Sequence, residues 1–292
     1  TVNLPESSAR LLALAMKEGI ETAFTSELIR SNSLACPDPE MENWPWQVKV
    51  RALGPFEVWK DGEKIQSARK ARQKPFELLK AVITLGCRNV SERAVADMLW
   101  PEAEGDAAHS AFATTLHRLR QLLGFEGFLE LKNGKLALDS RCCWVDAWAF
   151  EAALKRAEAS LKAGAVQKAL GEIDAAFGLY GGDFLSSDAE TPWTVQARDK
   201  LKERFCRVIL AASEVLLASG KTAQAVEYLS SGLTVDPSAE GLCQRLLEIN
   251  VRSGRRAEAL ALYQKLKESM AQKHGLEPAP ATKAIIESFF RK

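Results

Sequence analysis

Apolar residues between 106 and 124 recur with the period of a helix. Four large apolar side chains fall on one predicted buried stripe: Phe112, Leu116, Leu119 and Leu123. Asp106 can cap the start of this helix, and Gly124 is a helix-ending residue. The pattern therefore predicts an amphipathic helix that ends at Leu123.

The next apolar positions alternate, as in strands. From Leu129 to Leu138 leucines alternate with polar or small residues on either side of Asn133-Gly134. That dipeptide suits the two positive-φ positions of a type I′ turn. The pattern predicts a β-hairpin with Lys132 and Lys135 beside its turn, either as an ordinary surface hairpin or, after helices, as a wing.

Two further helices and a small sheet are predicted upstream. One helix begins in the basic stretch at Ala68 and includes Phe76-Glu77-Leu78-Leu79, and a short one ends at Leu99-Trp100-Pro101. The segment Trp46 to Ile65 is patterned as short antiparallel strands with turns at Gly54-Pro55 and Asp61-Gly62. A sheet, three helices and a hairpin in this order resemble a winged helix-turn-helix of the OmpR type.

The helix over 107–123 presents an outer face without acidic residues. A rotation of 100° per residue away from the buried stripe places five hydrogen-bonding side chains there: Ser110, Thr114, His117, Arg118 and Gln121. Arg and Gln pair with guanine and adenine edges in the major groove. We expect these residues to contact bases in double-stranded DNA; an ordinary solvated helix face is the alternative.

Charge favours the same region, although the whole chain is nearly neutral. It has 39 Lys and Arg against 38 Asp and Glu, a formal net charge of +1. The stretch from Arg69 to Arg93 contains seven basic residues and only two acidic ones, Glu77 and Glu92. We expect phosphate contacts from Arg69, Arg72, Lys74, Arg120, Lys132 and Lys135.

The chain after Val145 is patterned almost wholly as helices and contains a repeat. The stretch from Gly220 to Leu229 recurs 34 residues later, from Gly254 to Tyr263, and Gly164 begins a less regular copy. This is the tetratricopeptide period. Ser219-Gly220-Lys221-Thr222 imitates part of a phosphate-binding loop, but the first glycine of that motif is missing, so we expect no nucleotide site.

Composition sets the remaining expectations. With 47% hydrophobic and 26% charged residues, no long apolar run and no signal peptide, the chain is expected to be cytoplasmic, associated with the nucleoid and free of membrane. Cys142-Cys143 is expected to stay reduced rather than form a redox switch, and no metal, cofactor or catalytic motif is visible. We therefore expect a protein that is not an enzyme.

Several segments together resemble one family, the SARP-type activators with a bacterial transcriptional activator domain. The resemblance extends from Trp46 to Lys292 and rests on Leu53-Gly54-Pro55-Phe56-Glu57-Val58, Leu99-Trp100-Pro101, Leu116 to Gly124, Val145 to Phe150, Leu179-Tyr180-Gly181-Gly182-Asp183-Phe184-Leu185, Asp236-Pro237 and His274 to Pro278.

The front of the chain is patterned as two helices, 8–16 and 20–29, and a stiff linker that ends in Trp44-Pro45-Trp46. It resembles the end of the sensor region in large MalT-like regulators. Because the chain begins at Thr1, we expect it to be part of a longer protein. The expected domains are 1–45 (these helices and the linker), 46–143 (winged helix) and 144–292 (activator domain with tetratricopeptide-like helical repeats).

The resemblance implies a transcriptional activator that binds promoter repeats, where two protomers of a homodimer would suit the repeated sites, and that contacts RNA polymerase. The loop that contacts polymerase in this type of winged helix corresponds here to Glu102, Glu104 and Asp106; a solvated loop is the alternative. A different function also fits: a protein-interaction scaffold in which the helical repeats bind a partner and the winged helix is degenerate.

Overall fold

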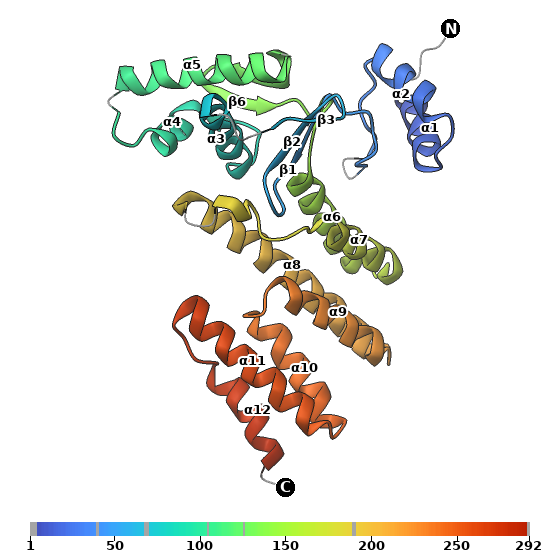
Figure 1. Cartoon of the computed structure of the whole chain (residues 1–292). Helices are drawn as coiled ribbons and strands as arrows, with labels where there is room; N and C mark the ends of the chain where they lie inside the picture. The colour runs from blue at the N-terminus through green and yellow to red at the C-terminus, as the bar shows by residue number, and fades with distance from the viewer. Residues whose placement is uncertain are drawn as a thin grey trace. The chain divides into compact units, whose positions relative to one another are not determined.

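A computed structural model describes residues 5–38, 41–66, 70–103, 105–124, 126–188 and 191–290. The chain is mainly helical with a small β part, as predicted (Figure 1). It divides into two compact units. The first comprises Thr1–Ala152 with Leu179–Ala197, and the second comprises Ala153–Gly178 with Arg198–Lys292.

A four-stranded sheet in the first unit has the order β3-β2-β1-β7. Its strands are β1 (Val48–Arg51), β2 (Glu57–Lys60), β3 (Glu63–Lys64) and β7 (Cys143–Val145). The predicted antiparallel β1, β2 and β3 are confirmed, with the β2–β3 turn at Asp61 and Gly62, whose φ angles are 49° and 89°. Strand β7, which pairs parallel to β1, was not predicted.

The three predicted helices and the hairpin are present. They are α3 (Lys70–Thr84), α4 (Glu92–Leu99), α5 (Gly105–Leu123), β5 (Leu129–Lys132) and β6 (Lys135–Leu138) (Figure 1). A short strand that we did not expect, β4 (Val90–Ser91), pairs with β6 and completes a second sheet of order β4-β6-β5.

The predicted stripe of α5 is buried: Phe112, Leu116, Leu119 and Leu123 are each at most 3% exposed. Gly124 follows α5 with a φ of 70°, so the predicted helix end is confirmed. The predicted start is wrong by two residues. Helix α5 begins at Gly105, and Asp106 lies inside its first turn, where a carboxylate is favoured by the exposed N–H groups.

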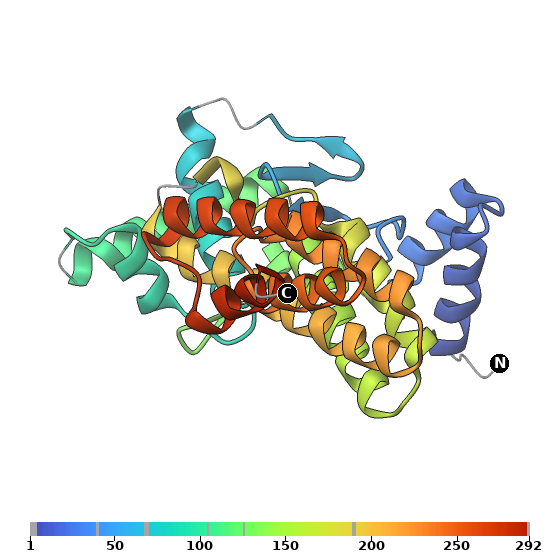
Figure 2. The same ribbon diagram turned by 90° about the horizontal axis from the view of Figure 1, so that it is seen from below.

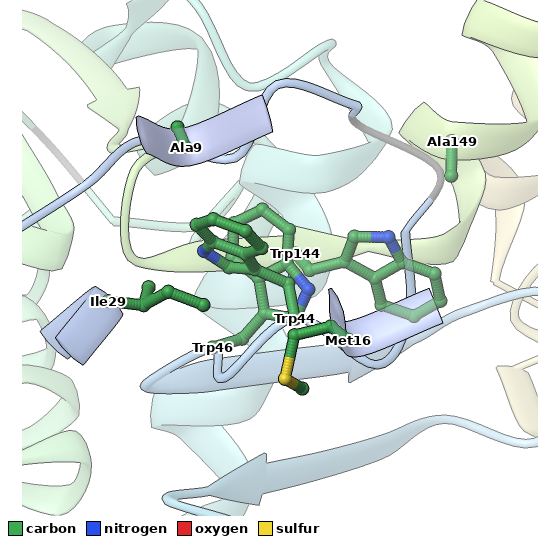
Figure 3. Packing of buried hydrophobic residues seen from close by; sticks show 7 residues of the cluster. All are labelled: Ala9, Met16, Ile29, Trp44, Trp46, Trp144 and Ala149. Carbon is green, nitrogen blue, oxygen red and sulfur yellow. The ribbon is translucent and has the colours of Figure 1, made fainter. Parts of the chain in front are cut away.

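The front helices α1 (Pro5–Lys17) and α2 (Thr22–Ser31) are part of the first unit and pack on its core. Their buried residues Ala9, Met16 and Ile29 share one hydrophobic cluster with the tryptophans at 44, 46 and 144 (Figure 3). Trp44 is 4% and Trp46 is 6% exposed. The segment expected to be a linker is instead part of a core, because its two indoles are large apolar surfaces that this packing removes from water.

Residues 179–197 belong to the first unit and contact the β1–β2 turn. The Gly54 N–H donates to the Asp183 carbonyl at 3.1 Å, and the Leu185 N–H donates to the Ala52 carbonyl at 2.7 Å. A Cβ atom on Gly181 would lie 2.8 Å from the Leu53 carbonyl oxygen, so only glycine fits there. The Leu-Tyr-Gly-Gly-Asp-Phe-Leu motif is therefore a structural contact to the sheet.

Asp146 fixes the same turn from the start of α6 (Asp146–Lys162). Its carboxylate accepts hydrogen bonds from the backbone N–H groups of Ala52, Leu53 and Ala147 at 2.7 to 2.9 Å. The residue is 2% exposed. Burial raises the pKa of this carboxyl to about 6, and the three N–H donors and Arg51 oppose that rise.

The second unit consists of helices joined by tight turns. It contains most of α6, α7 (Val166–Leu179) and α8 (Pro192–Ala218), and all of α9 (Thr222–Val235), α10 (Glu240–Arg252), α11 (Arg256–His274) and α12 (Pro280–Phe290). Helix α10 packs against α9, α11 and α12 (Figures 1 and 2).

The predicted 34-residue period corresponds to equivalent turns. Gly220 and Gly254 precede α9 and α11 with φ angles of 74° and 69°, and Ala225 and Ala259 are fully buried one turn into these helices. The Ser219-Gly220-Lys221-Thr222 segment follows helix α8 and not a strand, as a repeat turn would. None of the described helices is long and apolar enough to cross a membrane.

Candidate nucleic-acid interface

Helix α5 presents the predicted set of polar side chains to solvent. Ser110, Thr114, His117, Arg118 and Gln121 are all exposed. The apolar stripe on the opposite side of α5 is buried, and this burial fixes the rotation of the helix about its axis, so these five side chains point to solvent. The surface offers hydroxyl, imidazole, guanidinium and amide groups, which donate to or accept from base edges and phosphates.

The hairpin has the geometry of an exposed wing. Asn133 and Gly134 have φ angles of 49° and 68°, so the predicted turn with two positive-φ residues is confirmed. Lys132, Asn133, Gly134 and Lys135 are exposed at its tip. The Lys132 Nζ lies 2.5 Å from Glu130 Oε1, and these two side chains are 74% and 53% exposed. An exposed pair of this kind contributes little energy, so Lys132 can exchange it for a phosphate.

Three of the residues expected to contact phosphates lie on α3 or just before it, and only Lys74 has its side chain among the described residues. Lys74 is exposed, its Nζ lies 2.7 Å from Glu77 Oε2, and it also lies 5.9 Å from the centre of the Trp100 ring. Arg72 belongs to α3 by its backbone, but its side chain lies outside the described residues, as does the whole of Arg69.

Arg120 differs from the other candidates because it faces the wing. Its Nη2 and Nε donate to the Leu129 carbonyl of β5 at 2.8 and 3.3 Å. The side chain is partly buried. In this structure Arg120 connects α5 to β5, and a phosphate contact would compete with that hydrogen bond.

Glu92 and His109 form a contact in this region that the sequence patterns did not reveal. His109 Nδ1 lies 2.6 Å from Glu92 Oε1, and the two side chains are 71% and 16% exposed. They line a cavity of about 560 Å³ together with Ser91, Arg93, Ala96, Asp97, Ala103, Gly105, Ala108 and Gly134. The two residues are on different helices, so no periodicity in the sequence pairs them.

Two of the three acidic residues expected to contact RNA polymerase are described, and both are exposed to solvent. Glu102 is exposed in the turn after α4, and Asp106 is exposed in the first turn of α5. Glu104 lies outside the described residues. Within the described part of the chain, no three His, Cys, Asp or Glu side chains are grouped closely enough to hold a metal ion.

All six cysteines are free, and Cys142 and Cys143 are buried. Burial raises the pKa of Cys142 to about 12, so this thiol is poorly reactive at neutral pH.

Residues 145–289 match the protein-family model described as "Bacterial transcriptional activator domain". Among curated proteins, the chain is 26% identical over 244 residues to the regulatory protein AfsR of Streptomyces griseus, covering 84% of this chain and 24% of AfsR. It is 24% identical over 247 residues to the transcriptional regulatory protein EmbR of Mycobacterium tuberculosis, covering 82% of this chain and 62% of EmbR.

A solved structure has a similar fold. The structure of Mycobacterium tuberculosis EmbR in complex with a low-affinity phosphopeptide aligns with a TM-score of 0.62 and 23% identity. The alignment covers 84% of this chain and 65% of the EmbR chain. The chain thus spans less than two thirds of the length of each of these relatives.

Proposed function

We propose that this chain, whose residues 145–289 match the bacterial transcriptional activator domain, is a transcriptional regulator of the SARP type that activates transcription by binding promoter DNA through the winged helix. Helix α5 would lie in the major groove and the β5–β6 wing near the minor groove. The protein would act on the chromosome in the cytoplasm, and two copies would occupy repeated half-sites.

One observation carries the proposal. A helix face with five exposed hydrogen-bonding side chains and no acidic residue lies in the same small domain as an exposed wing with a lysine on each side of its turn. Base-edge contacts from Arg118 and Gln121 would give sequence preference, since bidentate pairs discriminate between bases. Ser110, Thr114 and His117 complete this base-contacting surface.

Phosphate contacts would orient the domain on the duplex. Lys74, Lys132 and Lys135 are exposed and suited to this role, and Arg69 and Arg72 are proposed from the sequence alone. Arg120 would contribute a phosphate contact only by leaving the Leu129 carbonyl. Such contacts carry no base preference and make binding sensitive to salt.

We further propose that the acidic surface at Glu102, Glu104 and Asp106 contacts RNA polymerase. Glu102 and Asp106 are exposed beside the start of α5. Reversing their charge should leave DNA binding intact and abolish activation in a purified transcription assay.

The proposal is tested by binding the chain to a library of random duplexes at two salt concentrations and sequencing the retained DNA. An enriched motif with repeated half-sites would support a specific regulator. Retention without a motif, absent at the higher salt, would mean that only backbone contacts remain. With the enriched duplex, Arg118→Ala should weaken binding about tenfold or more, whereas Arg252→Ala, an exposed arginine in the second unit, should not.

The alternative is a protein-interaction scaffold whose helical repeats bind a partner. No DNA retention at either salt would favour it. Charge reversal of Lys132 and Lys135 separates the two functions, because it should destroy DNA binding and leave a partner of the second unit bound.

A further inference from the structure

We propose that Glu92 and His109 are positioning residues that hold the wing at a fixed distance from the recognition helix α5. This inference rests on the proposed function for its effect on DNA, while the tether itself is a property of the free protein. Neither residue belongs to the base-reading or phosphate-contacting sets.

Glu92 contacts both the wing and helix α5. Its backbone N–H donates to the Gly134 carbonyl in the wing turn at 3.0 Å. Its Oε1 lies 2.6 Å from Nδ1 of His109 on α5. Solvent does not reach this oxygen, and within the described residues no group donates a hydrogen bond to it, so the His109 contact is an ion-pair contact and not a hydrogen bond. The same residue therefore connects the wing turn to the start of α5.

A second tether lies further along α5. Arg120 donates to the Leu129 carbonyl at the start of β5, the other end of the wing. His109 and Arg120 are eleven residues apart, which is about three helical turns, so they lie on nearly the same side of α5. The wing is thus connected to α5 near both ends of its hairpin, and both connections lie beside, not on, the base-reading face.

Because Glu92 is acidic, two explanations of its role predict opposite effects on DNA affinity when its side chain is removed. A carboxylate close to a DNA-binding surface repels phosphates, so its removal should strengthen binding if charge alone matters. If Glu92 sets the spacing of α5 and wing, its removal should weaken binding, because both elements must reach the duplex at once. The two explanations predict opposite signs.

Four variants of the full chain separate charge from geometry. Glu92→Ala removes the side-chain contact with His109 and leaves only the backbone N–H bond to Gly134. It should lower affinity for the enriched duplex about tenfold, although it makes the protein more positive. Glu92→Gln keeps a side chain of the same size packed against His109 without the charge, and should bind at least as tightly as the parent chain. His109→Ala should also lower affinity, and His109→Asn should restore most of it, because the Asn amide can place a donor near the position of Nδ1.

A DNA-independent measurement tests the tether directly. In the free protein, amide hydrogen exchange at Glu92 and across the wing should accelerate about tenfold in Glu92→Ala and His109→Ala, and should be unchanged in Arg118→Ala. Unchanged exchange in the first two variants would overturn the proposal, as would operator affinity that rises in Glu92→Ala. If the parent chain binds no duplex at all, the proposed function fails, and the exchange data still decide whether the tether exists.

Discussion

Lys80 and Asp188, which are 108 residues apart in sequence, form a bidentate ion pair in the first unit. The Lys80 Nζ lies 2.7 and 2.8 Å from the two Asp188 carboxylate oxygens, and 4.8 Å from the centre of the Phe56 ring. The side chains are only 14% and 22% exposed. The pair connects α3 of the proposed DNA-binding region to the segment that follows the Leu-Tyr-Gly-Gly-Asp-Phe-Leu motif.

Removing one partner of this pair should destabilise the first unit. We expect Lys80→Ala to lower the free energy of unfolding by about 2 kcal/mol, because a shielded carboxylate loses its counter-charge. All seven tryptophans lie in the first unit, so urea unfolding followed by tryptophan fluorescence reports on it. Arg93→Ala is the control: the Arg93–Asp97 pair is 3.8 Å long and 91% and 70% exposed, and its removal should cost less than about 0.5 kcal/mol. Equal losses of unfolding free energy in the two variants would contradict a stabilising role of the Lys80–Asp188 pair.

The tryptophan cluster predicts that the front helices stabilise the first unit. Trp46→Ala should lower its free energy of unfolding by about 3 to 5 kcal/mol, because a buried indole is replaced by a cavity and its hydrogen bond to the Met41 carbonyl disappears. Phe24→Ala is matched to it, since Phe24 is an aromatic residue of α2 but is 61% exposed. That variant should unfold at nearly the parent urea concentration; if Trp46→Ala did the same, residues 5–46 would form no common core with the sheet.

The contact between Gly181 and the Leu53 carbonyl predicts a strict requirement for glycine. Gly181→Ala should destabilise the first unit by about 2 kcal/mol, because its Cβ would lie 2.8 Å from a backbone oxygen. At Gly105 a Cβ meets no atom within 4 Å, so Gly105→Ala should change stability by less than about 0.5 kcal/mol. The fluorescence assay measures both, and a tolerated Gly181→Ala would show that the motif segment can move away from β1.

Burial of Asp146 predicts a pH dependence of stability with a defined sign. Its pKa is raised from an ordinary 3.8 to about 6 in the folded chain. Between these pH values the folded state binds more protons than the unfolded state, so the contribution of Asp146 to stability falls as pH rises from about 4 to about 6. The free energy of unfolding of the parent chain minus that of Asp146→Asn should therefore decrease by about 1 to 3 kcal/mol across this range. A difference that rises with pH would show that the N–H donors outweigh burial.

Salt dependence tests the wing. Replacing Lys132 and Lys135 by Gln should reduce the slope of log K against log salt by about 0.9 for each phosphate that is no longer neutralised. The sequence preference measured on the duplex library should remain, because these residues carry no base readout. Lys221→Gln, in a turn of the second unit, should leave the slope unchanged. A changed motif together with an unchanged slope would place the lysines away from the phosphates.

The parts of this fold that depend on local periodicity could be predicted, and those that depend on distant pairing could not. The buried stripe of α5 and the Asn133-Gly134 turn are visible because their signals repeat within a few residues. Strand β7 is three consecutive buried residues, Cys143–Val145, whose pairing with β1 leaves no period in the sequence. The indoles at 44 and 46 suggested a linker because prolines lie close by; their burial depends on α1 and α2.

The candidate site divides in the same way. The exposure of the α5 face follows from its buried stripe, so its five residues could be placed from the sequence. Arg120 lies at the border of that face, and its charge alone could not show that it faces β5. His109 and Glu92 are on separate helices, and only the tertiary fold brings them together.

The inclusion of residues 179–197 in the first unit has a consequence for how this protein is made. A ribosome synthesises the winged helix long before it reaches the Leu-Tyr-Gly-Gly-Asp-Phe-Leu segment, whose backbone closes the β1–β2 turn. The nascent chain would therefore carry an incomplete form of the proposed DNA-binding region until roughly the first third of the activator domain has emerged. Under the proposed function, competence to bind a promoter would then arise only in chains that have already begun to form the activator domain.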